Sequence, residues 1–142
     1  MSVILKMSRK FARESAFRLL YGFCMTGTVD PSFTEAFRSA PEMDADDAAY
    51  FDRVLCGAAA ESESLFSAIA SATEGFSLER IYKVDLAALL LAAYELKNCP
   101  EVNVPVIVDE AVTLADKYSA DKSGSFVNGI LAKLVGKLRV ES

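Results

Sequence analysis

Apolar residues recur along most of this chain at intervals of three and four residues, the spacing that places side chains on one face of an α-helix. The clearest example starts at Pro105, where apolar residues repeat with helical spacing at Ile107, Ala111, Leu114, Ala115 and Tyr118. No segment sustains the alternation of apolar and polar residues that marks a β-strand. The pattern therefore predicts an all-α protein.

Residues that favour helix ends divide this pattern into six or seven helices. Asp30 followed by Pro31, for example, predicts a helix start, because aspartate accepts hydrogen bonds from first-turn amides and proline fits that turn. Gly27 and Gly75 are predicted to follow helix ends. The predicted helices span about residues 8–24, 30–38, 44–73 (as one helix or a pair), 77–97, 105–118 and 125–138.

Residues 86–94 are apolar on nearly every side, which predicts a helix surrounded by other helices. The chain has 142 residues, of which 52% are hydrophobic. That length is enough for one domain, or for two small lobes that share a core. Gly129 lies inside the last predicted helix, and because glycine costs about 1 kcal/mol there, it predicts a close approach between helices.

A basic segment stands out in this acidic protein. The formal net charge is −5, whereas residues 6–21 contain five Lys or Arg and one Glu. On a helical wheel, one stripe holds Lys6, Arg9, Lys10 and Arg13, with Phe17 and Tyr21 beyond them. Basic groups beside aromatic rings suit single-stranded RNA, since they bind phosphates and stack on bases. The alternative is an amphipathic helix with a solvated basic edge.

Several classes of function are disfavoured by what the sequence lacks. It has no histidine, so neither a Ser-His nor a Cys-His nucleophile can form, and zinc would lack its commonest nitrogen ligand. It also has no glycine-rich phosphate loop. Cys24, Cys56 and Cys99 lie far apart in apolar surroundings and are interpreted as reduced core residues. We expect a non-enzymatic protein that needs no metal or cofactor.

The longest apolar run, residues 86–94, is too short to cross a bilayer. The first six residues do not form a signal peptide, and Met1 and Met7 are both candidate start residues. We expect a cytoplasmic protein that binds neither a membrane nor a small-molecule substrate.

Four motifs occur in a characteristic order. They are residues 9–21 (RKFARESAFRLLY), 91–96 (LAAYEL), 104–115 (VPVIVDEAVTLA) and 125–131 (SFVNGIL). Their order and spacing closely resemble the bacterial NusB family of transcription antitermination factors, from about residue 9 to residue 138. Each motif alone is weak, but the combination is specific.

The resemblance implies a single domain of residues 1–142, built as a compact bundle of six to seven helices. It implies two three-helix lobes, an N-terminal lobe of about 8–75 and a C-terminal lobe of about 77–140. The family binds the boxA element of ribosomal-RNA leader transcripts together with NusE, a small-subunit ribosomal protein. The complex helps RNA polymerase read through terminators, and some members are homodimers when free. The alternative is an interaction module of the same fold that homodimerises or binds another partner without specific RNA binding.

The resemblance also assigns candidate RNA-binding residues. Arg9, Lys10 and Arg13 match the family's arginine-rich start, although many relatives carry three or more consecutive arginines. Phe126 matches the phenylalanine of the last motif, and helical geometry aligns it with Lys133 rather than with the apolar stripe. Lys122 departs from the family pattern at its position, and it completes the candidate set because the reduced arginine run implies greater reliance on it. The alternative for Phe126 is packing beneath the loop of residues 119–124.

Tyr21 and Asp85 match positions that resemble the NusE-facing side of the family. Asp85 is a carboxylate just ahead of an apolar helix, so it needs water or a partner. The alternative is a favourable interaction with the helix N-terminus. Residues 30–79 hold eleven acids and two arginines, a charge that would attract a basic ribosomal protein.

Overall fold

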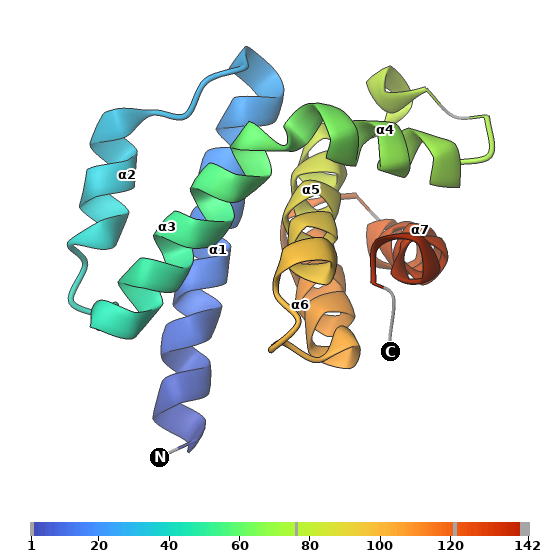
Figure 1. The fold of residues 1–142 in the computed structure, drawn as a ribbon. Helices are drawn as coiled ribbons and strands as arrows, with labels where there is room; N and C mark the ends of the chain where they lie inside the picture. Colours follow the sequence, from blue (N-terminus) through green and yellow to red (C-terminus); the bar gives the residue numbers. More distant parts are fainter. Residues whose placement is uncertain (1, 76, 121, 140–142) are drawn as a thin grey trace.

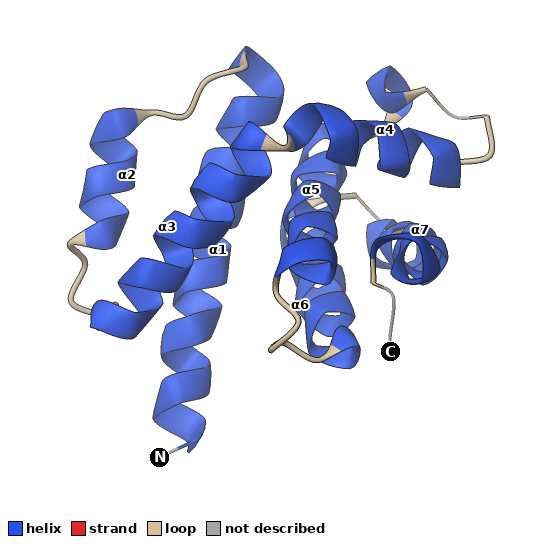
Figure 2. Ribbon diagram, in the orientation of Figure 1, coloured by secondary structure: helices blue, strands red, loops and turns tan. Residues whose placement is uncertain are grey.

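The computed structural model describes residues 2–75, 77–120 and 122–139, with side chains from Arg9 onward. Within these residues the secondary structure is entirely helical (Figures 1 and 2). The elements are α1 (Ser2–Thr26), α2 (Pro31–Arg38), α3 (Ala45–Ala60), α4 (Ser62–Ala72), the 3-10 helix η1 (Leu78–Arg80), α5 (Lys83–Asn98), α6 (Val104–Tyr118) and α7 (Ser123–Leu138). The all-α prediction is confirmed.

Several helices begin and end where local chemistry predicts. The Asp30 carboxylate accepts hydrogen bonds from the backbone N–H groups of Ser32 and Phe33, at 2.8 and 3.1 Å. Asp44 caps α3 in the same way. After α1, Gly27 adopts a φ of 82°, a left-handed conformation that glycine adopts without steric cost.

Other boundaries differ from the prediction. Helix α1 starts at Ser2 rather than Ser8, and residues 44–73 form a pair of helices that meet at Glu61. The helix predicted from Ser77 begins at Lys83 instead, after η1. Ile81 and Tyr82 have extended backbone there, and Ile81 is buried in the core.

Helix α5 lies at the centre of the molecule, as its sequence predicts. Every residue from Asp85 to Leu96 is buried, and α5 packs against α1, α3, α4, α6 and α7. In Figure 1, α2 and α3 lie on one side of it with α1, whereas α7 lies on the other. The division into lobes at about 8–75 and 77–140 stays a prediction.

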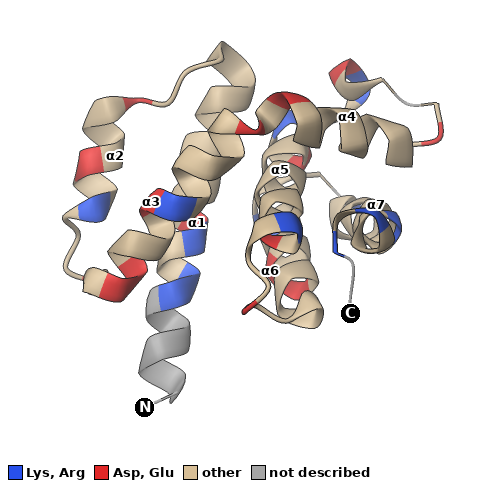
Figure 3. Ribbon diagram, in the orientation of Figure 1, with Lys and Arg blue, Asp and Glu red and all other residues tan. Residues whose placement is uncertain are grey.

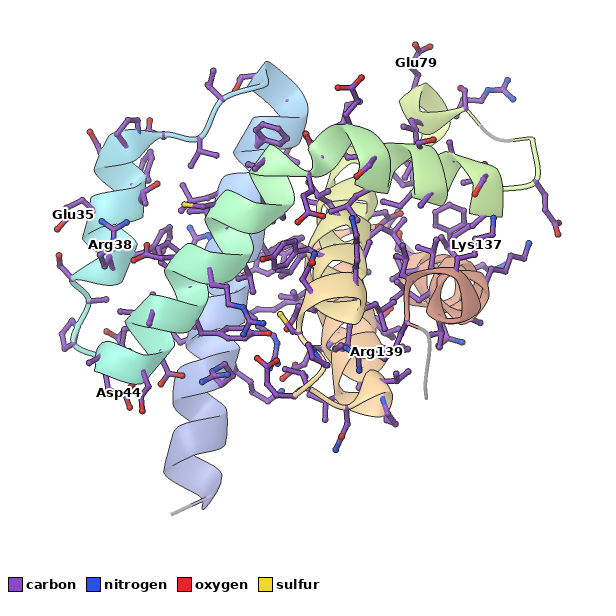
Figure 4. All side chains as sticks on the ribbon, in the orientation of Figure 1. Glu35, Arg38, Asp44, Glu79, Lys137 and Arg139 are labelled. Carbon is purple, nitrogen blue, oxygen red and sulfur yellow. The ribbon has the colours of Figure 1, made fainter. Side chains whose placement is uncertain are left out.

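Arg139 closes the C-terminal end of α5. Its guanidinium donates hydrogen bonds to four backbone carbonyls: Glu95, Leu96, Cys99 and Val102, at 2.6–3.0 Å. The last carbonyls of a helix have no partner within the helix, and a cation there also interacts well with the helix dipole. Arg139, labelled in Figure 4, therefore joins the end of α7 to the central helix.

Close helix packing occurs at Gly57, not at Gly129. A Cβ atom added to Gly57 would lie 2.3 Å from Cζ of Tyr94, so α3 approaches α5 there only because residue 57 lacks a side chain. A Cβ at Gly129 would meet nothing within 4 Å. The predicted close approach at Gly129 is therefore wrong, because that residue faces outward from α7.

We predict that Gly57→Ala destabilises the fold by about 1–3 kcal/mol, because the buried Tyr94 ring has little room to move. Gly129→Ala is the matched control, and it should stabilise the exposed helix by up to about 1 kcal/mol. Urea denaturation measures both. Equal effects of the two substitutions would contradict the assignment.

Candidate nucleic-acid interface

The basic residues of α1 form ion pairs with other helices. Arg9 Nε donates to Asp47 Oδ1 of α3 at 2.8 Å. Lys10 Nζ donates to Glu110 Oε2 of α6 at 2.9 Å. The Lys10 side chain remains 57% exposed and that of Arg9 33%. Figure 3 shows acidic positions on helices near the basic part of α1. The side chain of Lys6, the remaining basic residue of the predicted stripe, lies outside the described part.

Arg13 is buried, with only 5% of the residue exposed. Its Nε donates to Glu95 Oε2 of α5 at 2.9 Å, and the same carboxylate oxygen accepts the hydroxyl hydrogen bond of Tyr50. Burial alone would lower the pKa of Arg13, but the Glu95 carboxylate raises it above its ordinary value. Burial and the negative charge of Glu95 likewise raise the pKa of Tyr50. Arg13 therefore stays charged and Tyr50 neutral.

This position corrects the expectation that Arg13 is a surface contact for RNA. The helical wheel placed it off the apolar stripe, but α1 packs against both α3 and α5. Together, α3 and α5 cover more of the circumference of α1 than its apolar residues alone occupy, and Arg13 lies in the covered part. Its guanidinium is occupied inside the protein.

Tyr50 links the buried network to the surface. The Arg9 guanidinium lies 4.1 Å from the centre of its ring, and that of Arg53 lies 5.9 Å away. Cations over an aromatic face are attracted to it. Arg9 is thus held by Tyr50 and Asp47 together, at the border of the exposed basic surface.

We predict that Glu95→Ala destabilises the fold by about 3–5 kcal/mol, because it leaves the buried Arg13 charge without its partner. Glu110→Ala removes a surface partner and should cost at most about 1 kcal/mol. Chemical denaturation of both variants tests this. A small effect at Glu95 would mean that Arg13 reaches solvent and is available to a ligand.

The other candidate RNA-binding residues lie at α7, and α5 and α6 separate them from α1 in Figure 1. Phe126 is partly buried and packs against the core. Lys133 Nζ pairs with Glu74 Oε1 at 2.6 Å, and the hydrogen bond from Lys133 lowers the pKa of Glu74. Lys122 is exposed immediately before α7, with a φ of 70°. The structure therefore does not join the two candidate RNA regions into one cluster.

Asp85 is buried, with 2% of the residue exposed. One of its oxygens accepts a hydrogen bond from Ser123 Oγ at 3.0 Å. The other, Oδ1, has no hydrogen-bond partner among the described residues. Asp85 lies in the first turn of α5, where the helix dipole favours a carboxylate. Asp85 therefore fits the alternative stated for it, an interaction with the helix N-terminus, rather than a direct contact with a protein partner, and its hydrogen bond with Ser123 joins α5 to α7.

A mainly apolar groove of about 850 Å³ lies beside Tyr21. Its lining comes from α1, α2, the loop between them, and the adjoining ends of α5 and α6, and it includes Tyr21, Phe33, Val84 and Tyr118. Tyr21 is 38% exposed and Phe33 62%. Arg18 and Asp30 supply charges in the lining. Sequence reasoning missed the groove. No local pattern predicts it, because its lining comes from segments as far apart in the sequence as Phe17 and Tyr118.

The cysteines divide between core and surface. Cys99 is buried, Cys24 is half-buried and Cys56 is exposed, so the prediction of a core position is wrong for Cys56. Burial raises the pKa of the Cys24 thiol to about 11. In the part of the chain that is described, no three Cys, Asp or Glu side chains gather as metal ligands would. Nor does any helix in that part have the length and apolar character needed to span a bilayer.

Comparison with known proteins identifies this architecture. The NusB family model matches residues 10–136. The chain is 37% identical, over 131 residues, to the transcription antitermination protein NusB of Sorangium cellulosum, covering 92% of this chain and 94% of that protein. It is 34% identical to the NusB of Paraburkholderia phytofirmans, covering 96% and 94%.

Solved structures agree. The T. maritima NusB structure superimposes with a TM-score of 0.83 at 26% identity, covering 93% of each chain. A structure of antitermination factors NusB and NusE in complex with dsRNA matches with a TM-score of 0.79 at 28% identity, covering 92% of this chain and 97% of that one. The fold and the motifs thus define a transcription antitermination factor, a class without enzymatic activity. The chain belongs to the NusB family.

Proposed function

We propose that this protein binds boxA-like RNA of ribosomal-RNA leader transcripts together with NusE. In that complex it helps RNA polymerase read through terminators, which is a cytoplasmic function. The observation that carries the proposal is the match to a NusB chain solved with NusE and dsRNA, extending over 97% of that chain. The basic start of α1 supports it, since Lys10 and part of Arg9 are exposed to solvent.

The proposed RNA surface consists of Arg9 and Lys10 on α1, with Lys122, Phe126 and Lys133 at α7. Arg13 is left out, because a guanidinium paired with Glu95 in the interior has no free approach to a phosphate. Its role is to support α1 and Tyr50, against which Arg9 lies. An RNA strand that contacts both regions would cross the surface between α1 and α7.

The groove beside Tyr21 is the proposed docking surface for NusE. Exposed aromatic rings in a concave apolar surface are typical of the central contacts of protein interfaces. The acids of residues 30–79 flank this region in sequence, and they favour a basic ribosomal protein by electrostatic attraction. Val84 lines the groove, whereas its neighbour Asp85 is buried and does not.

A second candidate function is an interaction module that binds a second copy of the chain, or another protein, without specific RNA binding. The pairing of Arg9 and Lys10 with internal acids favours it. An electrophoretic shift with boxA RNA, with and without NusE, separates the two candidates. A scrambled RNA of the same length is the control. Equal binding of both RNAs in the presence of NusE would overturn the boxA proposal.

We predict that Phe126→Ala weakens RNA binding by about 1–3 kcal/mol if the ring stacks on a base. The fold should then lose less stability than the about 3–5 kcal/mol expected for a fully buried phenylalanine. Fluorescence anisotropy with labelled boxA RNA and thermal denaturation are measured on the same sample. A large loss of stability with unchanged affinity of the folded fraction would show that Phe126 is a packing residue.

We predict that Tyr21→Ser and Phe33→Ser each weaken NusE binding by at least about 1 kcal/mol, because each removes an aromatic contact from the groove. Tyr82→Ser is the matched control, since Tyr82 is an exposed tyrosine outside the groove lining. Calorimetric titration with NusE measures the effect. An equal loss at Tyr82 would place the NusE contact elsewhere, and a change only in self-association would favour the second candidate function.

A further inference from the structure

Part of the positive charge of the α1 basic run (the Lys and Arg of residues 6–21) is neutralised by carboxylates of other helices. Three cations of this run, Arg9, Lys10 and Arg13, pair with three carboxylates from other helices: Asp47 of α3, Glu95 of α5 and Glu110 of α6. These six groups together carry no net charge. Each of these three cations, which look unpaired in the sequence, is thus paired with a carboxylate in the folded protein, and an RNA phosphate must compete with that carboxylate for it.

The three ion pairs differ in how accessible their cations are to an RNA phosphate. The Arg13–Glu95 pair is nearly inaccessible, with side-chain exposures of 6% and 2%. Arg9 uses Nε toward Asp47 and its guanidinium rests on Tyr50, so this pairing also orients the side chain. Lys10 is the most exposed of the three cations, and its single ammonium nitrogen already donates to Glu110.

Glu110 is therefore the acid best placed to oppose RNA. Its side chain is 16% exposed, and its second carboxylate oxygen, Oε1, lies 3.9 Å from Nη1 of Arg13. It thus sits between the buried network and the surface ammonium. A phosphate that approaches Lys10 meets the negative charge of Glu110 within a few ångströms and must share or displace its hydrogen bond.

We propose that Glu110 sets the RNA affinity of this protein by holding Lys10 in an ion pair within the chain, at its surface, that phosphate must displace. The inference rests on the proposed RNA-binding function and adds to it an affinity-limiting residue on α6. Because Glu110 competes with phosphate for Lys10, the chain alone should bind RNA weakly. Stable RNA binding then depends on additional contacts made by the partner. The lysine is a compact point charge, and its attraction to RNA is reduced by this neighbouring carboxylate.

The test is Glu110→Gln, which keeps the size and a hydrogen-bonding oxygen but removes the charge. Affinity for boxA RNA should rise about two- to fivefold, the range expected from an exposed ion pair. The rise should be largest near 50 mM salt and shrink toward about 200 mM. Asp109→Asn is the matched control, because it removes the same charge from an exposed neighbour on α6. It should change affinity less than Glu110→Gln.

Repeating the measurement in a variant that lacks Lys10 shows whether the effect of Glu110→Gln acts through that lysine. In Lys10→Gln, the further change Glu110→Gln should give little or no gain, because the lysine that Glu110 holds is gone. Circular dichroism confirms that each variant is folded. An equal gain in the presence and absence of Lys10, or equal gains at Glu110 and Asp109, would reduce the effect to overall charge and overturn the inference.

Two further outcomes separate this inference from the function on which it rests. If the wild-type protein binds boxA RNA and Glu110→Gln binds it equally or more weakly, Glu110 orients Lys10 instead of opposing RNA, and only the inference fails. If neither protein binds boxA RNA, with or without NusE, the proposed function fails and the inference fails with it.

Discussion

The structure depends on one buried ionic contact, the pair between Arg13 of α1 and Glu95 of α5, with the Tyr50 hydroxyl of α3 on the same carboxylate. Two charges removed from water are costly unless each is paired and hydrogen-bonded. Here Arg13 and Tyr50 both donate hydrogen bonds to the Glu95 carboxylate. The three residues come from three helices, and their contact fixes the relative position of those helices more narrowly than apolar packing alone. Sliding α1 along α5 by a single turn would separate Arg13 from Glu95. The pair therefore fixes the register of α1, and with it the position of every basic residue that α1 presents.

The same contact explains why the basic surface is small. The cations of α1 that face other helices are met there by carboxylates: Asp47 of α3, Glu95 of α5 and Glu110 of α6. What remains for a ligand is the exposed part of Lys10 and Arg9. Farther along α1 the character changes: Arg18 lies over the Phe37 ring, 5.4 Å from its centre, and the helix then borders the apolar groove. One helix thus presents a polar surface at its start and an apolar one near its end.

Local features of the sequence predicted much of the fold, and long-range pairing accounts for what they missed. Asp30 and Asp44 were predictable as helix caps because their partners lie two or three residues away. The central position of α5 followed from its apolar surface. By contrast, Arg13 finds its partner 82 residues away, and Asp85 finds Ser123 38 residues away. A charge pattern on one helix does not reveal which of its residues another helix will cover, so Arg13 was assigned to the surface and the position of Asp85 was left open, and both residues are buried.

The groove beside Tyr21 was also not predictable from local sequence patterns, because distant segments of the chain line it. Helix α2 has no fully buried residue and is held by the pair between Arg38 and Asp52 at 2.6 Å and by the partly buried Phe37 ring, which packs against Phe11. Because α2 does not close over α1, aromatic rings remain open to a partner. Tyr118 lines this groove and also donates a hydrogen bond to Glu14, one residue from Arg13 along α1. One helix, α1, thus borders the groove and also carries the exposed parts of Arg9 and Lys10.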